Sequence, residues 1–246
     1  MSQPSKTCDW TEPPEPMAAG RPTIPGYEIL TELGRGGMGV VYKAERANPK
    51  RLVALKLMRD GALAGPQERA RFRVEAEAAA RIRHPNVVRI YEIGEHLGLP
   101  FFAMELIEGR SLDRHLAERA LTAGKSAELI RTLAYAVQQA HDQQIIHRDL
   151  KPGNILIAGP DESEIKITDF GLAKRLDSES TALTWDGAVL GTANYMAPEQ
   201  AAGRVHDVGP GADIYALGAI LYRIAHRSAA VSRRHVEPND RPCAER

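Results

Sequence analysis

The chain has 246 residues, which is enough for one large domain or for two small lobes around a shared site. Its 43% hydrophobic content is sufficient for a real core and excludes wholesale disorder. Lysine plus arginine equals aspartate plus glutamate at 32 each, so the charge balance gives no indication of binding to nucleic acid or to an anionic membrane surface.

Features near the two ends of the chain indicate its compartment. Cys8 and Cys243 lie far apart in tail-like sequence, so they provide neither a disulfide framework nor zinc-ligand spacing. No signal-peptide pattern is visible, and the longest apolar run, Ile214–Ile224, is too short to span a bilayer. We therefore expect a cytoplasmic protein without a membrane segment.

The first third of the chain is mostly β in character. Residues 1–25 are rich in proline, serine, threonine and acidic residues, without periodicity, and are expected to form a disordered leader. Runs of β-branched and aromatic residues then predict five strands: Tyr27–Leu33, Val40–Ala44, Leu52–Met58, Val87–Glu92 and Pro100–Glu105. One stretch rich in alanine, arginine and glutamate, about Pro66–Arg83, predicts a helix that ends at His84-Pro85-Asn86.

After Gly109 the pattern becomes helical. Ser126 is the predicted N-cap of a helix whose apolar face is marked by Leu129, Leu133, Val137 and Ala140. Short strands are predicted at Ile155–Ile157 and Ile165–Ile167, an exposed loop at Asp177–Asp186, and a further helix at Ala212–His226. A β-rich part followed by an α-rich part indicates the α+β class with two lobes.

A glycine-rich segment lies between the first two predicted strands, and it reads Gly34-Arg35-Gly36-Gly37-Met38-Gly39. Glycines permit a tight turn and let backbone N–H groups approach phosphate oxygens. An ordinary glycine hairpin is the alternative, and this motif alone does not decide between the two. A Rossmann site requires a helix directly after the glycines, where Val40–Tyr42 predicts strand, and the Walker pattern Gly-Lys-Ser/Thr is absent.

A lysine on the third predicted strand is the next candidate. Strand alternation places Ala54 and Lys56 on one face, and a lysine that faces inward needs an anion such as a phosphate or a carboxylate. A solvent-facing lysine is the alternative. A glutamate of the Pro66–Arg83 helix that faces inward would pair with Lys56. Glu75 and Glu77 cannot both face it, because they lie two residues apart on a helix.

A longer constellation decides between these alternatives. It consists of two segments, His147-Arg148-Asp149-Leu150-Lys151-Pro152-Gly153-Asn154 and Asp169-Phe170-Gly171. The Asp149 carboxylate is suited to orient an acceptor hydroxyl and take its proton. The side-chain oxygens of Asn154 and Asp169 are hard donors that suit magnesium, and Lys151 would approach a transferred phosphoryl group as a point charge. The order and spacing argue against a chance cluster of charges on a surface loop.

These segments resemble the signature set of protein kinases: a glycine-rich loop, a strand lysine, a His-Arg-Asp catalytic loop and Asp-Phe-Gly. Met196–Glu199 resembles the Ala-Pro-Glu element, and Asp213–Gly218 resembles the buried-aspartate helix that supports the catalytic loop. The Leu-Lys-Pro context of Lys151 is similar to serine/threonine kinases. Gly-Gly-Met-Gly in the glycine loop and the run Tyr195–Gln200 are similar to the bacterial, Hanks-type branch.

The resemblance covers about residues 26–226 and implies an α+β, bilobal protein-kinase-like fold. Residues 26–105 would form an N-terminal lobe with a five-stranded antiparallel sheet plus one helix, residues 105–109 a hinge, and residues 110–226 a mainly helical C-terminal lobe. The implied activity is transfer of the γ-phosphoryl group of ATP to protein serine and threonine hydroxyls. The implied cofactors are ATP and Mg²⁺, with Mn²⁺ as an alternative metal.

The resemblance also assigns roles to single residues. The phosphates of ATP would be covered by Gly34, Arg35, Gly36, Gly37, Met38 and Gly39. Lys56 would contact the α- and β-phosphates, with Glu75 favoured over Glu77 as its partner. The adenine pocket would be formed by Val41, Ala54, Met104, Glu105, Ile107 and Leu156. Asp149 would be the catalytic base, Lys56 and Lys151 would neutralise charge, and Asn154 and Asp169 would hold two metal ions.

The segment before the Ala-Pro-Glu element is the expected place of regulation. Phosphate on one of Ser178, Ser180, Thr181 and Thr184 would pair with Arg148 and order this segment, and the two threonines are the preferred sites. Thr192 is expected to form a hydrogen bond near Asp149 and Lys151 rather than to accept phosphate.

The chain departs from the family pattern after the last predicted helix. Residues 227–246 lack apolar periodicity and are expected to form an irregular tail, which would leave the C-terminal lobe incomplete. The side chains expected to lose their cover, and to form a patch for self-association, are Ile214, Leu217, Ile220 and Leu221.

Two alternatives to an active kinase remain. One is a catalytically impaired, pseudokinase-like module that binds nucleotide and interacts with other proteins. The other is a small-molecule phosphotransferase, which Gly191-Thr192 and Met196–Glu199 disfavour, because these elements build a protein-substrate groove in the family. The expected partners are ATP and protein substrates, without nucleic acid.

Overall fold

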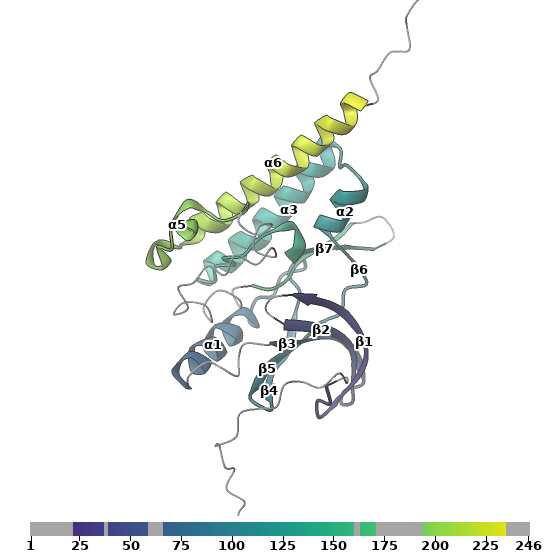
Figure 1. Cartoon of the computed structure of the whole chain (residues 1–246), viewed down its shortest axis with the longest axis vertical. Helices are drawn as coiled ribbons and strands as arrows, with labels where there is room; N and C mark the ends of the chain where they lie inside the picture. The colour runs from purple at the N-terminus through teal and green to yellow at the C-terminus, as the bar shows by residue number, and fades with distance from the viewer. Residues whose placement is uncertain (1–21, 37–38, 59–65, 160–162, 171–193, 235–246) are drawn as a thin grey trace, which may run out of the picture.

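The computed structural model describes residues 22–36, 39–58, 66–159, 163–170 and 194–234. A lobe built around a sheet is followed along the chain by a lobe built mainly from helices (Figure 1). Helix α1 (Pro66–Ala79) lies beside the sheet, and the two long helices of the other lobe lie side by side. The predicted α+β, two-lobed architecture is confirmed.

Five antiparallel strands form the sheet of the first lobe, in the order β1-β2-β3-β5-β4. Their bounds are β1 Tyr27–Gly36, β2 Gly39–Arg46, β3 Arg51–Met58, β4 Ile90–His96 and β5 Leu99–Glu105. The five predicted strands are therefore present. The prediction placed the fourth one too early, because Val87 forms its bridge with Ile167 of the other lobe instead of joining β4.

The first lobe has a core that begins before Gly26. Ile24 is 2% exposed and packs with Val40, Tyr42 and Leu55, and its carbonyl accepts the N–H of Tyr27 at 3.0 Å. The predicted end of the disordered leader at residue 25 is therefore too late by a few residues. The composition of the leader gave no sign of one apolar residue that anchors it.

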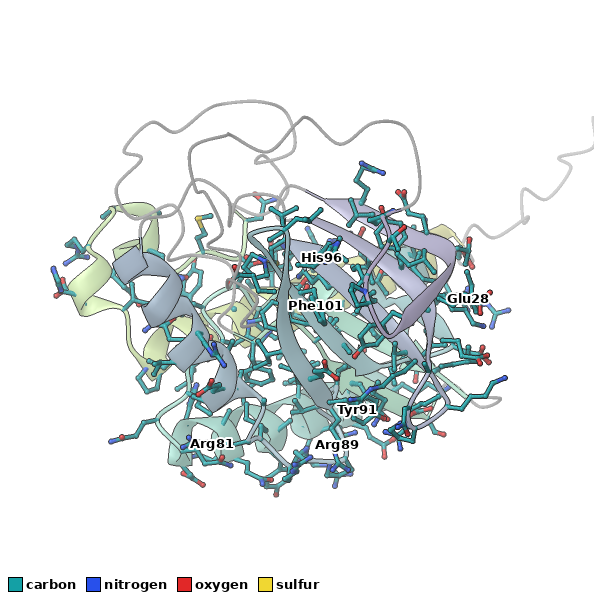
Figure 2. All side chains as sticks on the ribbon, turned by 90° about the horizontal axis from the view of Figure 1, so that it is seen from below. Glu28, Arg81, Arg89, Tyr91, His96 and Phe101 are labelled. Carbon is teal, nitrogen blue, oxygen red and sulfur yellow. The ribbon has the colours of Figure 1, made fainter. Side chains whose placement is uncertain are left out.

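One edge of the sheet carries stacked cations. The guanidinium carbons of Arg51 and Arg89 lie 4.5 and 5.9 Å from the ring centroid of Tyr91. Figure 2 shows Arg89 and Tyr91 close together at one end of β4 and His96 at the other. The edge strand β4 is partly buried along most of its length, whereas its neighbour β5 is buried from Phe101 to Met104.

The second lobe contains a small sheet and its helices. The sheet has the order β6-β7-β8, with bounds Gly109–Ser111, Ile155–Ala158 and Glu164–Ile167. The helices are α2 Leu112–Glu118, α3 Ala123–Asp142, α5 Pro198–Ala201 and α6 Pro210–Arg234, and short 3₁₀ turns lie at η2 Pro152–Asn154 and η3 Val205–Asp207.

Helix α3 begins earlier than predicted. Thr122 is its N-cap, with a hydroxyl that accepts the N–H of Lys125 at 3.3 Å. Ser126 lies inside the helix and donates its hydroxyl to the carbonyl of Thr122 at 2.8 Å, so the prediction of Ser126 as the cap is wrong. Thr122 and Ser126 both have a hydroxyl suited to an N-cap, and Thr122, the earlier of the two in the chain, is the cap. The predicted apolar face is confirmed, since it lies in the core with Leu129, Leu133, Val137 and Ala140 all buried.

Helix α6 packs one side on α3 and exposes the other. Leu217 and Ile220 are buried in the shared core, so the prediction that they lack cover is wrong. Ile214 and Leu221 are exposed as predicted, at 63% and 41%. The four residues share one broad side of the helix, an arc of about 120°, and the edge of the contact with α3 runs through that arc, so that only Leu217 and Ile220 are covered.

Helix α6 also runs further than predicted. It ends at Arg234 rather than His226, so the prediction of irregular structure is wrong for residues 227–234. Neither proline nor glycine occurs in that stretch, and alanine and arginine sustain a helix that is already anchored. Residues 235–246 lie outside the described residues, and an incomplete C-terminal lobe stays a prediction. Among the described residues, no helix combines the length and apolar character that a bilayer span requires.

Candidate active site

Lys56 reaches across the junction between the lobes. It lies on β3 and is 5% exposed, and its Nζ is 2.7 Å from Oδ1 of Asp169, which follows β8. The alternative of a solvent-facing lysine is therefore wrong. A buried ammonium group requires an anionic partner, and in this structure a carboxylate of the opposite lobe provides it.

Asp169 is held as a carboxylate in an unusual backbone conformation. Burial acts to raise the pKa of Asp169, but the ammonium group of Lys56, assisted by His147 and Lys151, holds that pKa below its ordinary value. Its φ of 64° lies in the left-handed region, which is uncommon for residues other than glycine, although aspartate adopts it more readily than most. Such conformations persist where the surroundings determine them, and they cluster at functional sites.

The loop of residues 147–154 gathers three further predicted residues. Asp149 is 8% exposed, and its Oδ2 lies 2.9 Å from Nζ of Lys151. Asn154 donates its side-chain amide to the backbone carbonyl of Asp149 at 2.8 Å and to Oδ2 at 3.3 Å. The backbone carbonyl of Asn154 accepts the N–H of Thr168 at 3.0 Å, which places this loop directly beside Asp169.

Asp213 supports the loop from below. It lies on α6 and is 1% exposed, and its two carboxylate oxygens accept the backbone N–H groups of His147 and Arg148, each at 2.8 Å. Oδ2 also lies 2.8 Å from Nε2 of His141 on α3. The carboxylate thus joins α3, α6 and the 147–154 loop into one unit.

His147 connects the loop to the segment after β8 that carries Asp169. Its Nε2 lies 2.9 Å from the carbonyl oxygen of Thr168, and its Nδ1 accepts the N–H of Asp149 at 3.3 Å. The ring packs against Phe170 with a centroid distance of 4.7 Å. These contacts fix the distance between the two segments that carry the candidate residues.

The predicted ion pair between Lys56 and Glu75 is not formed among the described residues. Lys56 contacts Asp169, and Oε2 of Glu75 lies 4.0 Å from Nη1 of Arg148 instead. The neighbouring Glu77 is paired with Arg73 on the exposed side of α1, at 3.1 Å. Of the two glutamates, Glu75 is the one that faces the 147–154 loop. Its partner depends on how α1 sits relative to the 147–154 loop, which residue spacing does not reveal.

The glycine segment is described on both sides of Gly37 and Met38, which lie outside the described residues. Arg35 pairs with Glu32 at 2.8 Å on the exposed surface, and its guanidinium holds the pKa of Glu32 below its ordinary value. Gly39 is needed for packing, because a Cβ there would lie 2.0 Å from the carbonyl oxygen of Leu57. A Cβ at Gly34 would meet no atom within 4 Å.

The residues predicted for an adenine pocket share one apolar cluster. Met104 is 4% exposed and packs with Phe102, Val88 and Met58. The partly buried members that pack against this cluster include Ala54, Ile107 and Leu156. Val41 lies next to it, because it is the register partner of Lys56 on the neighbouring strand.

Glu105 is fixed at the junction by contacts to both lobes. Its Oε1 pairs with Nζ of Lys166 on β8 at 2.8 Å, and its Oε2 accepts the N–H of Arg89 at 3.2 Å. Its side chain is therefore engaged away from the apolar cluster, so only its backbone is suited to a ligand there.

The donor set for a metal is limited to oxygen. Because the Nδ2 of Asn154 faces two oxygens of Asp149, its Oδ1 is left for a cation, and Asp169 has a second oxygen beyond the one that contacts Lys56. Within the described ranges, no group of three or more His, Cys, Asp or Glu residues is placed to hold a metal ion. Two oxygen donors suit Mg²⁺, which retains water and phosphate oxygens as its other ligands.

Sequence reasoning missed His141 and Lys166. His141 lies one turn after Val137, at the end of the apolar face of α3, and an ionisable group at such a position needs a partner. That signal was available. Lys166 alternates with the buried Ile167 on a short strand, and nothing in its spacing identifies Glu105 as its partner.

Comparison with known proteins identifies the family. A family model described as the protein kinase domain matches residues 27–241. The chain belongs to the protein kinase family. Among curated relatives of this kinase domain, serine/threonine-protein kinase PrkC of Bacillus subtilis is 38% identical over 209 residues, which cover 85% of this chain and 31% of PrkC. The probable serine/threonine-protein kinase PknB of Lactococcus lactis is 40% identical over 200 residues, which cover 80% of this chain and 31% of that protein.

Solved structures agree with the relatives. The kinase domain of Mycobacterium tuberculosis PknI matches with a TM-score of 0.67 and 29% identity, over 85% of this chain and 77% of that chain. The predicted bacterial serine/threonine kinase family and the kinase fold are thus confirmed. The chain spans about a third of the length of the curated relatives that it matches.

Proposed function

We propose that this chain is a serine/threonine protein kinase domain that transfers the γ-phosphoryl group of ATP to serine or threonine hydroxyls of proteins. One observation carries the proposal. A continuous series of contacts begins at Lys56, which pairs with Asp169. Thr168, the residue before Asp169, donates its N–H to the carbonyl of Asn154. Asn154 in turn contacts Asp149, which pairs with Lys151. Charged groups from both lobes therefore converge on one place, as phosphoryl transfer requires.

Each side chain of this series has a task in the proposed reaction. Asp149 would accept the proton of the acceptor hydroxyl, and its contact with Lys151 orients the carboxylate. Lys56 and Lys151 would neutralise charge on the phosphate oxygens. Catalysis then consists mainly of positioning and charge stabilisation, which a rigid and largely buried set of residues supports.

ATP would bind between the glycine segment and the apolar cluster. Gly34 borders open space, so packing among the described residues gives no reason for glycine there, whereas close approach of phosphate to the backbone does. The adenine ring would contact Ala54, Ile107 and Leu156, and the backbone of residues 105–107 would provide its hydrogen bonds.

The metal would be held by the side-chain oxygens of Asn154 and Asp169. Bound magnesium supplies a Lewis acid that neutralises charge on the phosphates. In this structure Lys56 already contacts Asp169, and the lowered pKa keeps that carboxylate ionised and ready to bind a cation. Asp169 would therefore not have to lose a proton if a metal cation replaced Lys56 as its partner.

Replacing Asp149 tests the proposal directly. We expect Asp149→Asn to reduce transfer of labelled phosphate from ATP to a generic basic protein by about 10²–10⁴-fold, because the general base is lost. Binding of Mg-ATP, measured as a shift in melting temperature, should persist. The control is Asp207→Asn, an exposed aspartate that pairs with Arg204, and it should behave like the unmodified chain.

The outcomes separate the alternatives. Equal loss of binding and transfer in Asp149→Asn would remove Asp149 from the role of base. A thermal shift with Mg-ATP without transfer by the unmodified chain would favour the catalytically silent, nucleotide-binding module. The preferred phosphorylation sites Thr181 and Thr184 lie outside the described residues, and they, the cytoplasmic location and a role in signalling stay predictions.

We also propose self-association through the outer side of α6. Ile214 and Tyr222 are 63% and 69% exposed on this helix, and a hollow of about 850 Å³ is lined by Tyr215, Tyr222 and Arg223 among others. Apolar surface of this kind commonly marks an interaction site. Sedimentation velocity should detect a dimer that Tyr222→Glu weakens, and a strictly monomeric chain at high concentration would contradict the proposal.

A further inference from the structure

Gln200 joins the Ala-Pro-Glu element to the loop that carries Asp149. It lies in α5 and is partly buried, and its Nε2 donates to the backbone carbonyl of Arg148 at 2.7 Å. Its Oε1 accepts the backbone N–H of Ala197 at 3.1 Å. The two ends of one side-chain amide therefore contact two segments that lie far apart in the chain.

Arg148 is the residue that this contact holds. Its φ of 64° lies in the left-handed region, which is rare for a residue other than glycine, asparagine or aspartate. Its N–H donates to Oδ1 of Asp213 at 2.8 Å, and its carbonyl accepts from Gln200. The strained conformation is thus fixed at both backbone polar groups, one by α6 and one by α5.

The carbonyl of Arg148 belongs to the peptide group that continues into Asp149. Because a peptide group is planar, its carbonyl and the N–H of Asp149 share one plane. That N–H donates to Nδ1 of His147 at 3.3 Å. Gln200 and His147 therefore hold the two opposite edges of the peptide group that precedes the Cα of Asp149.

We infer that Gln200 is a positioning residue for Asp149: its amide N–H fixes the peptide plane that precedes the proposed base. The inference rests on the proposed kinase function. It assigns a role to the residue that directly follows the Ala-Pro-Glu element, and it makes the placement of the base depend on α5. A small displacement of a base is costly, because proton transfer requires hydrogen-bonding distance.

The alternative role for Gln200 is to cap α5 and nothing more. The two ends of its amide distinguish these roles. Gln200→Glu keeps an oxygen that accepts from Ala197 but removes the N–H that donates to Arg148. Gln200→Met has a similar length and removes both contacts.

We expect Gln200→Glu to lower kcat about tenfold, which corresponds to about 1.4 kcal/mol, with KM for ATP unchanged within about twofold. Its melting temperature should stay within about 3 °C of the unmodified chain, because the contact to Ala197 remains. Gln200→Met should lower kcat by at least as much. A capping role alone predicts normal kcat for Gln200→Glu, and that result would overturn the inference.

Gln139 provides a matched control. Its Nε2 donates to the backbone carbonyl of Arg83 at 2.9 Å, so it makes the same kind of contact on the outer surface of α3. Gln139→Glu should leave kcat and KM for ATP unchanged. A tenfold loss in this control would show that the change reflects the added charge, and the inference would fail.

A second measurement does not depend on turnover. Hydrogen–deuterium exchange of the unmodified chain and Gln200→Glu should show faster exchange confined to amides of residues 147–150. Should Gln200→Glu also melt early, the exchange pattern decides: acceleration confined to this loop supports the inference, and acceleration spread over α3 and α5 overturns it. The two proposals can fail separately. If the unmodified chain transfers no phosphate, the proposed function is contradicted, and faster exchange of residues 147–150 in Gln200→Glu would still support the contact of Gln200 with this loop.

Discussion

Replacing Asp213 by alanine removes the carboxylate that holds the 147–154 loop in place. The backbone N–H groups of His147 and Arg148 then lose their acceptor. His141, which lies on α3, loses its hydrogen bond to the same carboxylate. Asp213 is 1% exposed, so water does not reach these groups easily. The change therefore tests whether the loop depends on this one side chain.

The magnitude follows from these contacts. A buried donor left without a partner costs about 1–3 kcal/mol, so the two N–H groups together give about 2–6 kcal/mol, to which the loss at His141 adds. A domain of this kind has a total stability of about 5–15 kcal/mol, so the chain should be close to unfolding. Asp213→Asn retains one acceptor oxygen and should cost roughly half as much.

Urea unfolding, followed by circular dichroism and extrapolated linearly to water, measures this effect. The control is Asp207→Ala, an exposed carboxylate that lies 3.4 Å from Arg204, and it should change stability by less than about 1 kcal/mol. A loss below about 1 kcal/mol for Asp213→Ala would refute the reasoning, because it would show that other groups or water satisfy the two N–H groups.

Three further changes test other parts of the structure. Lys56→Met removes the ammonium group 2.7 Å from Asp169, so kcat should fall by about 10²-fold or more in a phosphate-transfer assay, and full turnover would exclude a role for this lysine. Ile220→Ala, in the core, should cost about 2–5 kcal/mol in urea unfolding, against about 0.5 kcal/mol for the exposed Ile214→Ala, and equal costs would contradict the packing of α6. Burial and the hydrogen bond to Glu92 raise the pKa of Tyr27 to about 12. The unfolded chain therefore loses this proton at a lower pH than the folded chain does, so the free energy of unfolding should fall between pH 10 and about 12. Tyr27→Phe should flatten that fall, and an unchanged slope would contradict the assignment.

The residues of the candidate site were predictable because each belongs to a motif in which local order carries the information. Lys56 follows from strand alternation, and Asp149, Asn154 and Asp169 follow from their positions in two short segments. The apolar face of α3 was equally predictable, since a 3.6-residue period marks it over several turns. In each case the relevant interactions lie within one element or one loop.

Partners across elements were not predictable in the same way. Glu75 faces Arg148 in this structure because of the position of α1 relative to the loop, and no spacing in the sequence encodes that position. Ile24 is a core residue in a stretch whose composition indicates disorder. The role of Gln200 depends on the left-handed backbone of Arg148, a conformation for which arginine has no intrinsic preference.

The hydrogen bonds of the segment Asn86–Val88 determine where the backbone crosses between the two lobes. By sequence it lies between α1 and β4, yet its backbone is bonded to Ile167 on both sides, each bond at 2.8 Å, and the side chain of Asn86 donates to the carbonyl of Ile165. The chain thus passes from the sheet lobe to the helical lobe before Asn86, returns after Val88, and passes over again after Glu105. Any movement of one lobe relative to the other would have to bend the backbone at these crossings, so we expect the C-terminal end of α1, which leads into the first crossing, to move less than its N-terminal end.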